Sequence, residues 1–295
     1  MNLSLKGERF KVGFRGGPIG YLIIHFILLA AIIVTAYPLF YILFTSVMPF
    51  ENFIKSNIHL LPSGFTLVYF QNIFSNMNLV HGFLNSIYRT VTGTALTVTC
   101  TMMAAYALSI YKLRFGRFLS GFFLIPMFFN AGLIPFYLTM NAYGITNTFW
   151  VLILPGVCSP MWFFIAKANL ATYSREILEA AKIDGAGQVR IFWRIVWPTN
   201  TPIIAIVGLM TGLGHWNEYF TTRILVKKDL WTAPVYLYSI LQEQKLFAEL
   251  GRGNILNPLS YQAAVAACLI VPIIFIYPFL QRYVVSGLTE GSVKG

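Results

Sequence analysis

The run YLIIHFILLAAIIVTAYPLFYILF, from Tyr21 to Phe44, contains no Asp, Glu, Lys or Arg. An α-helix rises about 1.5 Å per residue, so about 20 apolar residues cross a hydrocarbon core of about 30 Å. The run is also longer than the apolar part of a secretory signal peptide, which is about 7 to 15 residues. It therefore predicts a first membrane helix that is not cleaved off.

The composition of the whole chain agrees with this first run. Of its 295 residues, 57% are hydrophobic and only 11% are charged, which is far from the mixture found in soluble domains. We predict an all-α integral membrane protein with about six transmembrane helices. The candidate spans are roughly 20–45, 85–110, 118–141, 148–167, 202–222 and 261–281.

The basic residues predict how the chain is oriented in the bilayer. The net charge of +11 does not indicate nucleic-acid binding, because Lys and Arg lie in short segments between apolar runs. Fourteen of the 21 would share one side, which is then the cytoplasm. Those 14 are Lys6, Arg9, Lys11, Arg15, Lys112, Arg114, Arg117, Lys167, Arg175, Lys182, Arg190, Arg194, Arg282 and Lys294. Both termini are expected to be cytoplasmic. The N-terminal segment is 1–19, the permease domain is 20–281 and the C-terminal tail is 282–295.

The last of the outer loops, from about 221 to 260, contains a possible helix of its own. Leu237 to Leu250 alternates apolar and polar residues in a pattern compatible with a short surface helix, and Gly251, Gly253 and Pro258 follow it. Such a helix either lies on the membrane surface or contacts a docked partner. The sequence leaves both alternatives open.

The segment from Ser174 to Pro202 is too long and too regular for a simple turn. Ser174 is a suitable N-cap for a first helix, and Gly185 is a suitable residue to end it. A second helix is expected from about Gly187 to Val196, with Pro198 marking its end. The sequence thus predicts a pair of helices between the fourth and fifth spans.

The first of these helices is suited to docking. Its small Ala180 and Ala181 would allow another protein surface to come close, and Glu179 and Asp184 could anchor that surface through charged hydrogen bonds. We interpret the helix pair as a cytoplasmic docking element.

These residues resemble a known motif. Glu179-Ala180-Ala181, then Asp184-Gly185-Ala186, and then Ile195 and Pro198 resemble the EAA loop, here about 174–202, of binding-protein-dependent ABC importer permeases. One departure is Trp197, where leucine is common, and it concerns local packing. The resemblance implies the type I importer fold and a coupling helix that fits a cleft on an ATPase subunit. The residues it assigns to coupling are Glu179, Ala180, Ala181, Asp184, Gly185, Ala186 and Pro198.

Two further stretches are similar to the maltose-type carbohydrate permeases. They are Trp216-Asn217-Glu218-Tyr219 and the C-terminal run from Gly287 to Gly295. The resemblance implies import of an oligosaccharide by alternating access across the cytoplasmic membrane of a bacterium. It also implies three kinds of partner: a second, homologous permease subunit, two ATPase subunits and an extracytoplasmic sugar-binding protein. In that subgroup the C-terminal tail reaches the ATPases, which assigns this role to Ser292, Val293, Lys294 and Gly295.

The chain itself lacks the motifs of an enzyme. It has no G-x-x-x-x-G-K-[ST] phosphate loop, so ATP and Mg are expected in the partner ATPase subunits. The four histidines show no metal-ligand spacing, and no catalytic framework is recognisable. We expect no cofactor or metal in this chain, and no catalytic activity of its own.

The residues of the substrate pathway are harder to assign. Sugars are commonly held by hydrogen bonds together with flat apolar surfaces, which makes polar and aromatic groups in or near the spans candidates. The alternative is that they bond neighbouring helices or belong to an interfacial aromatic belt, and that Glu218 is solvated at the outer interface. The candidates are Tyr106, Asn130, Trp216, Asn217, Glu218 and Tyr219.

Two other classes of function are alternatives for a membrane protein of this kind. A secondary transporter or channel for a small polar solute would need ion-coupling acids near the midplane or inverted repeats, and neither is visible. A membrane enzyme acting on lipids would need clustered acids or histidines at one interface, but the ten acidic residues are dispersed.

Overall fold

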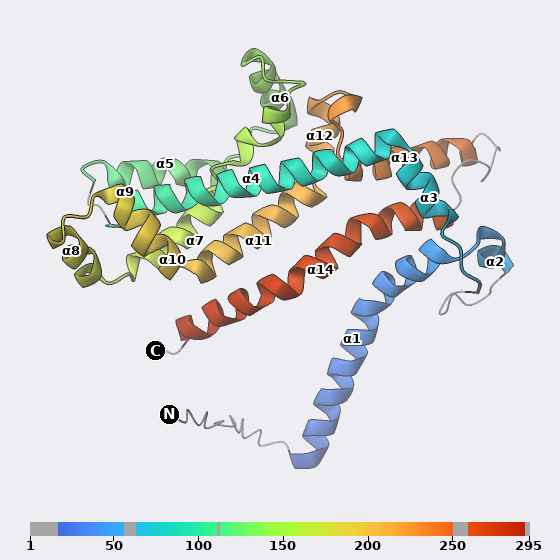
Figure 1. The fold of residues 1–295 in the computed structure, drawn as a ribbon, viewed down its shortest axis with the longest axis horizontal. Helices are drawn as coiled ribbons and strands as arrows, with labels where there is room; N and C mark the ends of the chain where they lie inside the picture. Colours follow the sequence, from blue (N-terminus) through green and yellow to red (C-terminus); the bar gives the residue numbers. More distant parts are fainter. Residues whose placement is uncertain (1–16, 56–62, 111–112, 250–258, 293–295) are drawn as a thin grey trace.

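The computed structural model describes residues 17–55, 63–110, 113–249 and 259–292, and within these it contains helices and no strand. Figure 1 shows an elongated bundle with α8 at one end and α2, α3 and α13 at the other. The elements are α1 (Gly17–Val47), α2 (Phe50–Lys55), α3 (Val68–Ser75), α4 (Met77–Ile110), α5 (Gly116–Phe128), α6 (Leu133–Ala142), η1 (Phe149–Leu152), η2 (Leu154–Gly156), α7 (Pro160–Ala171), α8 (Arg175–Ile183), α9 (Gln188–Ile191), the π-helix η3 (Phe192–Val196), α10 (Trp197–Thr199), α11 (Thr201–Asn217), α12 (Phe220–Leu225), η4 (Lys228–Leu230), α13 (Ala233–Glu249) and α14 (Leu259–Ser292).

Helices long and apolar enough to cross a membrane confirm the predicted class of protein. Within the described residues, three qualify without interruption: Ile19–Val47, Met77–Ile110 and Leu259–Phe279. Two bent helix pairs raise the number to as many as five, and α5 is a shorter apolar helix. The elements that share most of their contacts are α4 and α11, α4 and α7, and α1 and α14.

Three of the six predicted spans are broken rather than continuous. The third, 118–141, divides into α5 and α6 around Gly132, whose φ of +84° is one that a residue with a side chain rarely adopts. The fourth, 148–167, consists of η1 and η2 followed by α7, with a bend of 45°. The fifth ends at Asn217, where Glu218 turns to an extended backbone with ψ of 122°.

Other boundaries also differ from the prediction. Helix α4 begins at Met77, before the predicted 85, and α14 continues to Ser292, past the predicted 281. The expected tail therefore begins inside a helix. The expected surface helix at Leu237–Leu250 is confirmed as the longer α13, Ala233–Glu249, whereas Leu250, Gly251, Gly253 and Pro258 lie outside the described residues.

Glycines allow α4 and α11 to approach closely. A Cβ placed on Gly93 would lie 2.6 Å from Nε2 of His215, so only glycine leaves room for this imidazole. On the facing helix, a Cβ on Gly212 would lie 3.4 Å from Oγ1 of Thr94. These contacts bring His215, near the end of α11, directly against α4.

Helix α1 stands partly apart from the bundle. Its last turns lie beside α14, while its first half diverges from the other helices (Figure 1). In this chain alone, large side chains on that half are mostly exposed, among them Leu22 at 73% and Phe26 at 70%. This half of α1 is therefore free to contact lipid or another membrane subunit.

Candidate coupling segment and central cavity

Helix α8 ends in a hydrogen-bonded turn that depends on Gly185. The N–H of Gly185 donates to the carbonyl of Lys182 at 3.0 Å, and the N–H of Ala186 donates to that of Ala181 at 2.9 Å. Together these bonds form a Schellman motif, which places the residue after the cap in the left-handed region. Gly185 has a φ of +75°, as the motif requires. The sequence prediction that Gly185 ends this helix is confirmed.

The two faces of α8 differ sharply in exposure. Leu178 and Ala181 are 3% and 8% exposed and pack into the main hydrophobic core, whereas Ile183 is 87% exposed. Of the residues assigned to coupling, Ala181 faces inward and Ala186 is half-buried. The others, Glu179, Ala180, Asp184, Gly185 and Pro198, are exposed. Val189 and Ile177, on the same helix pair, are also exposed, at 73% and 48%.

Behind α8, an aromatic cluster joins the docking element to the spans. Phe192 is 3% exposed, and its ring centroid lies 5.3 Å from that of Tyr106 in α4 and 5.8 Å from that of Trp197. Tyr106 also donates its hydroxyl to Gln188 at 3.4 Å, a long hydrogen bond. The candidate pathway residue Tyr106 thus lies at the coupling end of the bundle, in contact with the docking element.

The connection from this cluster to α11 is bent by 82°. The π-helix Phe192–Val196 precedes the bend, and the buried Asn200 stabilises it by donating its side-chain amide to the carbonyl of Val196 at 2.7 Å. Single π-helical turns within α-helices are frequent at functional sites. The predicted second helix, Gly187 to Val196, therefore exists but continues through Pro198 to Thr199.

A central cavity of about 450 Å³ lies between α4, α7, α11 and the segments η1 and η2. Its wall contains an ion pair, in which Nη1 of Arg89 lies 2.9 Å from Oε2 of Glu218. Oγ1 of Thr222 accepts a bond from Arg89 and donates to the same carboxylate at 2.6 Å. The other carboxylate oxygen accepts the N–H of Thr221 at 2.7 Å. Glu218 therefore joins α4 to the first turn of α12.

Arg89 is the site residue that the sequence reasoning missed. Its side chain is 5% exposed, and it lies inside the second predicted span, which has no other charged residue. An ionisable side chain within a span usually pairs with another polar group, so Arg89 could have been recognised as needing a partner, although the sequence does not identify which one. Glu218 is also less solvated than expected, with 26% of its side chain exposed.

The remaining pathway candidates do not gather at this cavity. Trp216 points toward α14, where its indole N–H donates to the carbonyl of Leu269 at 3.0 Å. Tyr219 stacks on Tyr238, with centroids 5.0 Å apart. Asn130 lies between α5 and α6 and accepts the N–H of Gly132 at 2.9 Å.

Two sets of candidate residues remain to be placed. Asn217 is exposed at the end of α11. At the C-terminus, Ser292 is the last residue of α14, and Val293, Lys294 and Gly295 lie outside the described residues.

Comparison with known proteins agrees with this architecture. The model of the family described as "Binding-protein-dependent transport system inner membrane component" matches residues 97–290, which include the docking element, α13 and the lining of the central cavity except Arg89. The chain belongs to this family. Members of the family are transport subunits, and a secondary transporter or channel is not favoured.

Individual relatives extend the match over nearly the whole permease. This chain is 30% identical to the polygalacturonan/rhamnogalacturonan transport system permease protein YtcP of Bacillus subtilis, over 93% of this chain and 97% of that protein. It is 32% identical to the maltodextrin transport system permease protein MdxG of the same organism, over 79% and 82%. A crystal structure of a bacterial ABC transporter involved in the import of the acidic polysaccharide alginate contains a chain with the same fold, at a TM-score of 0.83 and 24% identity, covering 92% of this chain and 98% of that one.

Proposed function

We propose that this permease forms half of the membrane pathway of an ATP-driven importer for oligosaccharides. Two relatives are named as permeases of transport systems, one for polygalacturonan or rhamnogalacturonan and the other for maltodextrin. These names support a carbohydrate substrate. The partners are a second, homologous permease, two ATPase subunits that hold ATP and Mg, and an extracytoplasmic sugar-binding protein. The complex lies in the cytoplasmic membrane of a bacterium, with both termini of this chain in the cytoplasm.

The observation that carries the proposal is the division of α8 into a buried and an exposed face. Its exposed face, with Ile183, Glu179 and Ala180, is the coupling surface that an ATPase covers. Its buried face is set in the same core as residues of α4, α7 and α11. Closely packed interiors transmit displacement rather than absorbing it. Closure of the ATPases therefore moves three membrane helices together with α8.

The charges around this element support the proposed orientation. Arg175, Lys182, Arg190 and Arg194 are all exposed on or beside the helix pair, on the side where basic residues are retained. The central cavity then lies further into the bilayer, and α13 lies outside. Rigid-body motion of helices around such a cavity alternates its access between the two sides.

The diverging half of α1 supports the presence of a second permease. This half diverges from the bundle in Figure 1, and its large apolar side chains are mostly exposed, so it would lie across a neighbouring subunit in the membrane. The C-terminal segment from Ser292 to Gly295 is proposed to reach the ATPases, on the resemblance to the maltose-type permeases.

The proposal is tested by purifying the tagged chain with its co-expressed partners in mild detergent. We expect an ATPase and a second permease to co-purify, and Glu179→Arg to remove the ATPase while the membrane domain stays monodisperse. Glu51→Arg, which reverses an exposed carboxylate at the opposite end of the bundle, is the matched control and should retain every subunit. If the wild-type chain purifies without an ATPase, or if Glu179→Arg retains it, the proposal is wrong.

A further inference from the structure

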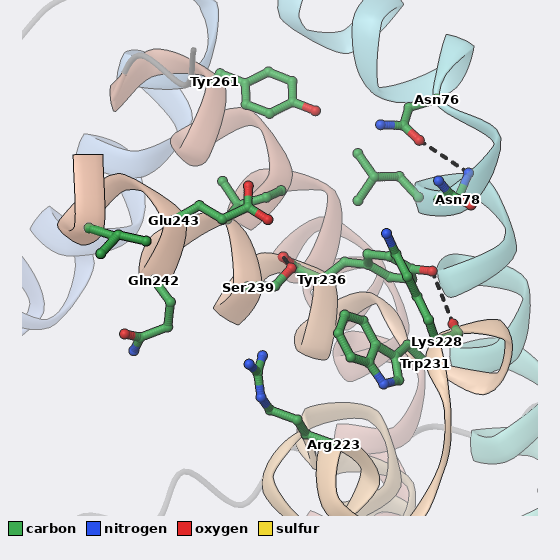
Figure 2. Close-up of a pocket in the computed structure, with 13 residues that line it drawn as sticks. Asn76, Asn78, Arg223, Lys228, Trp231, Tyr236, Ser239, Gln242, Glu243 and Tyr261 are labelled. Carbon is green, nitrogen blue, oxygen red and sulfur yellow. Dashed lines mark hydrogen bonds between the residues drawn. The ribbon is translucent and has the colours of Figure 1, made fainter. Parts of the chain in front are cut away.

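A second pocket, which we call the outer pocket, lies at the end of the bundle opposite α8. Its volume is about 450 Å³, and it is enclosed by the junction of α3 with α4, by α12 and η4, by α13 and by the start of α14. Figure 2 shows these residues surrounding an open space. Small-molecule sites typically measure about 300 to 1,000 Å³, so the outer pocket has the size of a binding site.

The floor of the outer pocket is a rigid aromatic surface. The rings of Trp231 and Tyr236 meet edge to face, with centroids 5.5 Å apart and an interplanar angle of 69°. Tyr236 is 7% exposed and donates its hydroxyl to the carbonyl of Lys228 at 3.1 Å, as drawn in Figure 2. Burial, with a smaller effect of Asp229, raises the pKa of Tyr236, so the phenol stays protonated as a donor. The guanidinium of Arg223 lies 5.5 Å from the Trp231 ring centroid and fixes that ring further.

The walls of the pocket offer unused hydrogen-bonding groups. In Figure 2, the carboxylate of Glu243 and the hydroxyl of Tyr261 project from α13 and α14 toward the pocket, and Asn78 lies on its far side. In the part of the chain that the structure describes, none of these three side chains has a protein partner in a hydrogen bond or ion pair. A carboxylate accepts hydrogen bonds, whereas a phenol and an amide each donate and accept them. Together these groups match the donors and acceptors of neighbouring hydroxyl groups.

We propose that the outer pocket binds one or two sugar units of the transported oligosaccharide before they enter the central cavity. The inference rests on the proposed function and adds a carbohydrate site on the extracytoplasmic face of this subunit. The half-buried ring of Trp231, next to convergent polar groups, favours a saccharide. Trp, Tyr and Arg also anchor protein interfaces, so the test below includes retention of the sugar-binding protein. With Arg223 and Lys228 beside one carboxylate, the site accepts a neutral or an acidic sugar.

The test measures saccharide binding to the full-length chain alone in nanodiscs, by saturation-transfer-difference NMR. The probes are maltotriose, arabinotriose and trigalacturonate, which separate neutral from acidic sugars. Two substitutions each change one polar group of the pocket: Tyr261→Phe removes a hydroxyl, and Glu243→Gln neutralises a carboxylate. Their matched controls lie outside the pocket: Tyr88→Phe removes an exposed hydroxyl from α4, and Glu51→Gln neutralises an exposed carboxylate of α2.

We expect saturable binding of at least one trisaccharide, weakened about fivefold by Tyr261→Phe and about tenfold by Glu243→Gln, with both controls unchanged. Absence of saturable binding for all three probes, or equal weakening in the controls, overturns the proposal. It is also overturned if the two variants lose retention of the sugar-binding protein while saccharide binding is unchanged, because the pocket is then a protein-docking surface. Failure of the wild-type complex to take up sugar with ATP would instead contradict the proposed function, since binding is measured without the partners.

Discussion

Replacing Glu218 by alanine leaves the guanidinium of Arg89 buried without its counter-ion. The side chain of Arg89 is 5% exposed, and Glu218 is its partner at 2.9 Å. Removing one member of a fully buried pair typically costs about 3 to 5 kcal/mol. Glu218 is 26% exposed, so water reaches part of the site and we take the lower end, about 3 kcal/mol. Loss of the hydrogen bonds to Thr221 and Thr222, which act as a helix cap for α12, adds about 1 kcal/mol.

The assay is thermal unfolding of the detergent-purified chain, followed by the fraction that remains monodisperse. A destabilisation of about 3 to 4 kcal/mol, at about 2 to 4 °C per kcal/mol for chains of comparable size, lowers the midpoint by roughly 6 to 16 °C. One heating rate is used throughout, because unfolding in detergent is commonly irreversible. Glu218→Gln keeps a hydrogen-bond acceptor but loses the negative charge. Its destabilisation should therefore be smaller, about 1.5 to 3 kcal/mol.

A double-mutant cycle decides whether the pair itself is responsible. Arg89→Met removes the cation that Glu218→Ala leaves unpaired, so the double variant should be more stable than the sum of the two single effects, by about 2 kcal/mol. Additive effects, or a Glu218→Ala midpoint within about 2 °C of the wild type, would refute the reasoning from the buried ion pair.

Two further predictions concern the packing that connects the coupling element to the cavity. Gly93→Ala places a Cβ 2.6 Å from Nε2 of His215 and should destabilise the chain by about 1 to 3 kcal/mol through overpacking. Stability should recover in the Gly93→Ala/His215→Ala double variant. The same thermal assay checks this, and a destabilised double variant would contradict it. Phe192→Leu shrinks the ring that touches Tyr106 and should lower sugar uptake per ATP hydrolysed while the ATPase still co-purifies. Uptake is measured in proteoliposomes, with Phe118→Leu, at a 73% exposed position, as the control.

The turn that ends α8 could be predicted from the sequence because its signals are local. Gly185 lies one residue after the cap of α8, and the glycine preference of that position arises from the backbone conformation of the turn alone. The direction of each side chain was less predictable. Ala180 and Ala181 are adjacent in the motif, yet only Ala180 is exposed, because the core of this chain already occupies the other face.

The breaks in the spans could not be predicted by hydropathy. A window of about 19 residues averages over a short irregular segment when both flanks are apolar, as they are around Gly132. The pairing of Arg89 with Glu218 was beyond the sequence for another reason, since the two residues are 129 positions apart. No local pattern relates such positions, although the isolated charge in the second span indicated that a partner was needed.

The broken helices and the ion pair together indicate which parts of the permease move. At the coupling end, α4, α7 and α11 share one core, and at the cavity Arg89 joins α4 to the residue after α11. A helix of 17 residues rises about 25 Å, so α11 alone spans most of the distance between these two ends. Because α4 and α11 are held together at both ends, displacement of α8 should carry them as one body. Irregular backbone at membrane depth is tolerated where it lines a cavity, and η2 does so through Pro155 and Gly156. Opening of the central cavity is therefore expected at η1, η2 and the α5–α6 break, while the ion pair stays intact in both states.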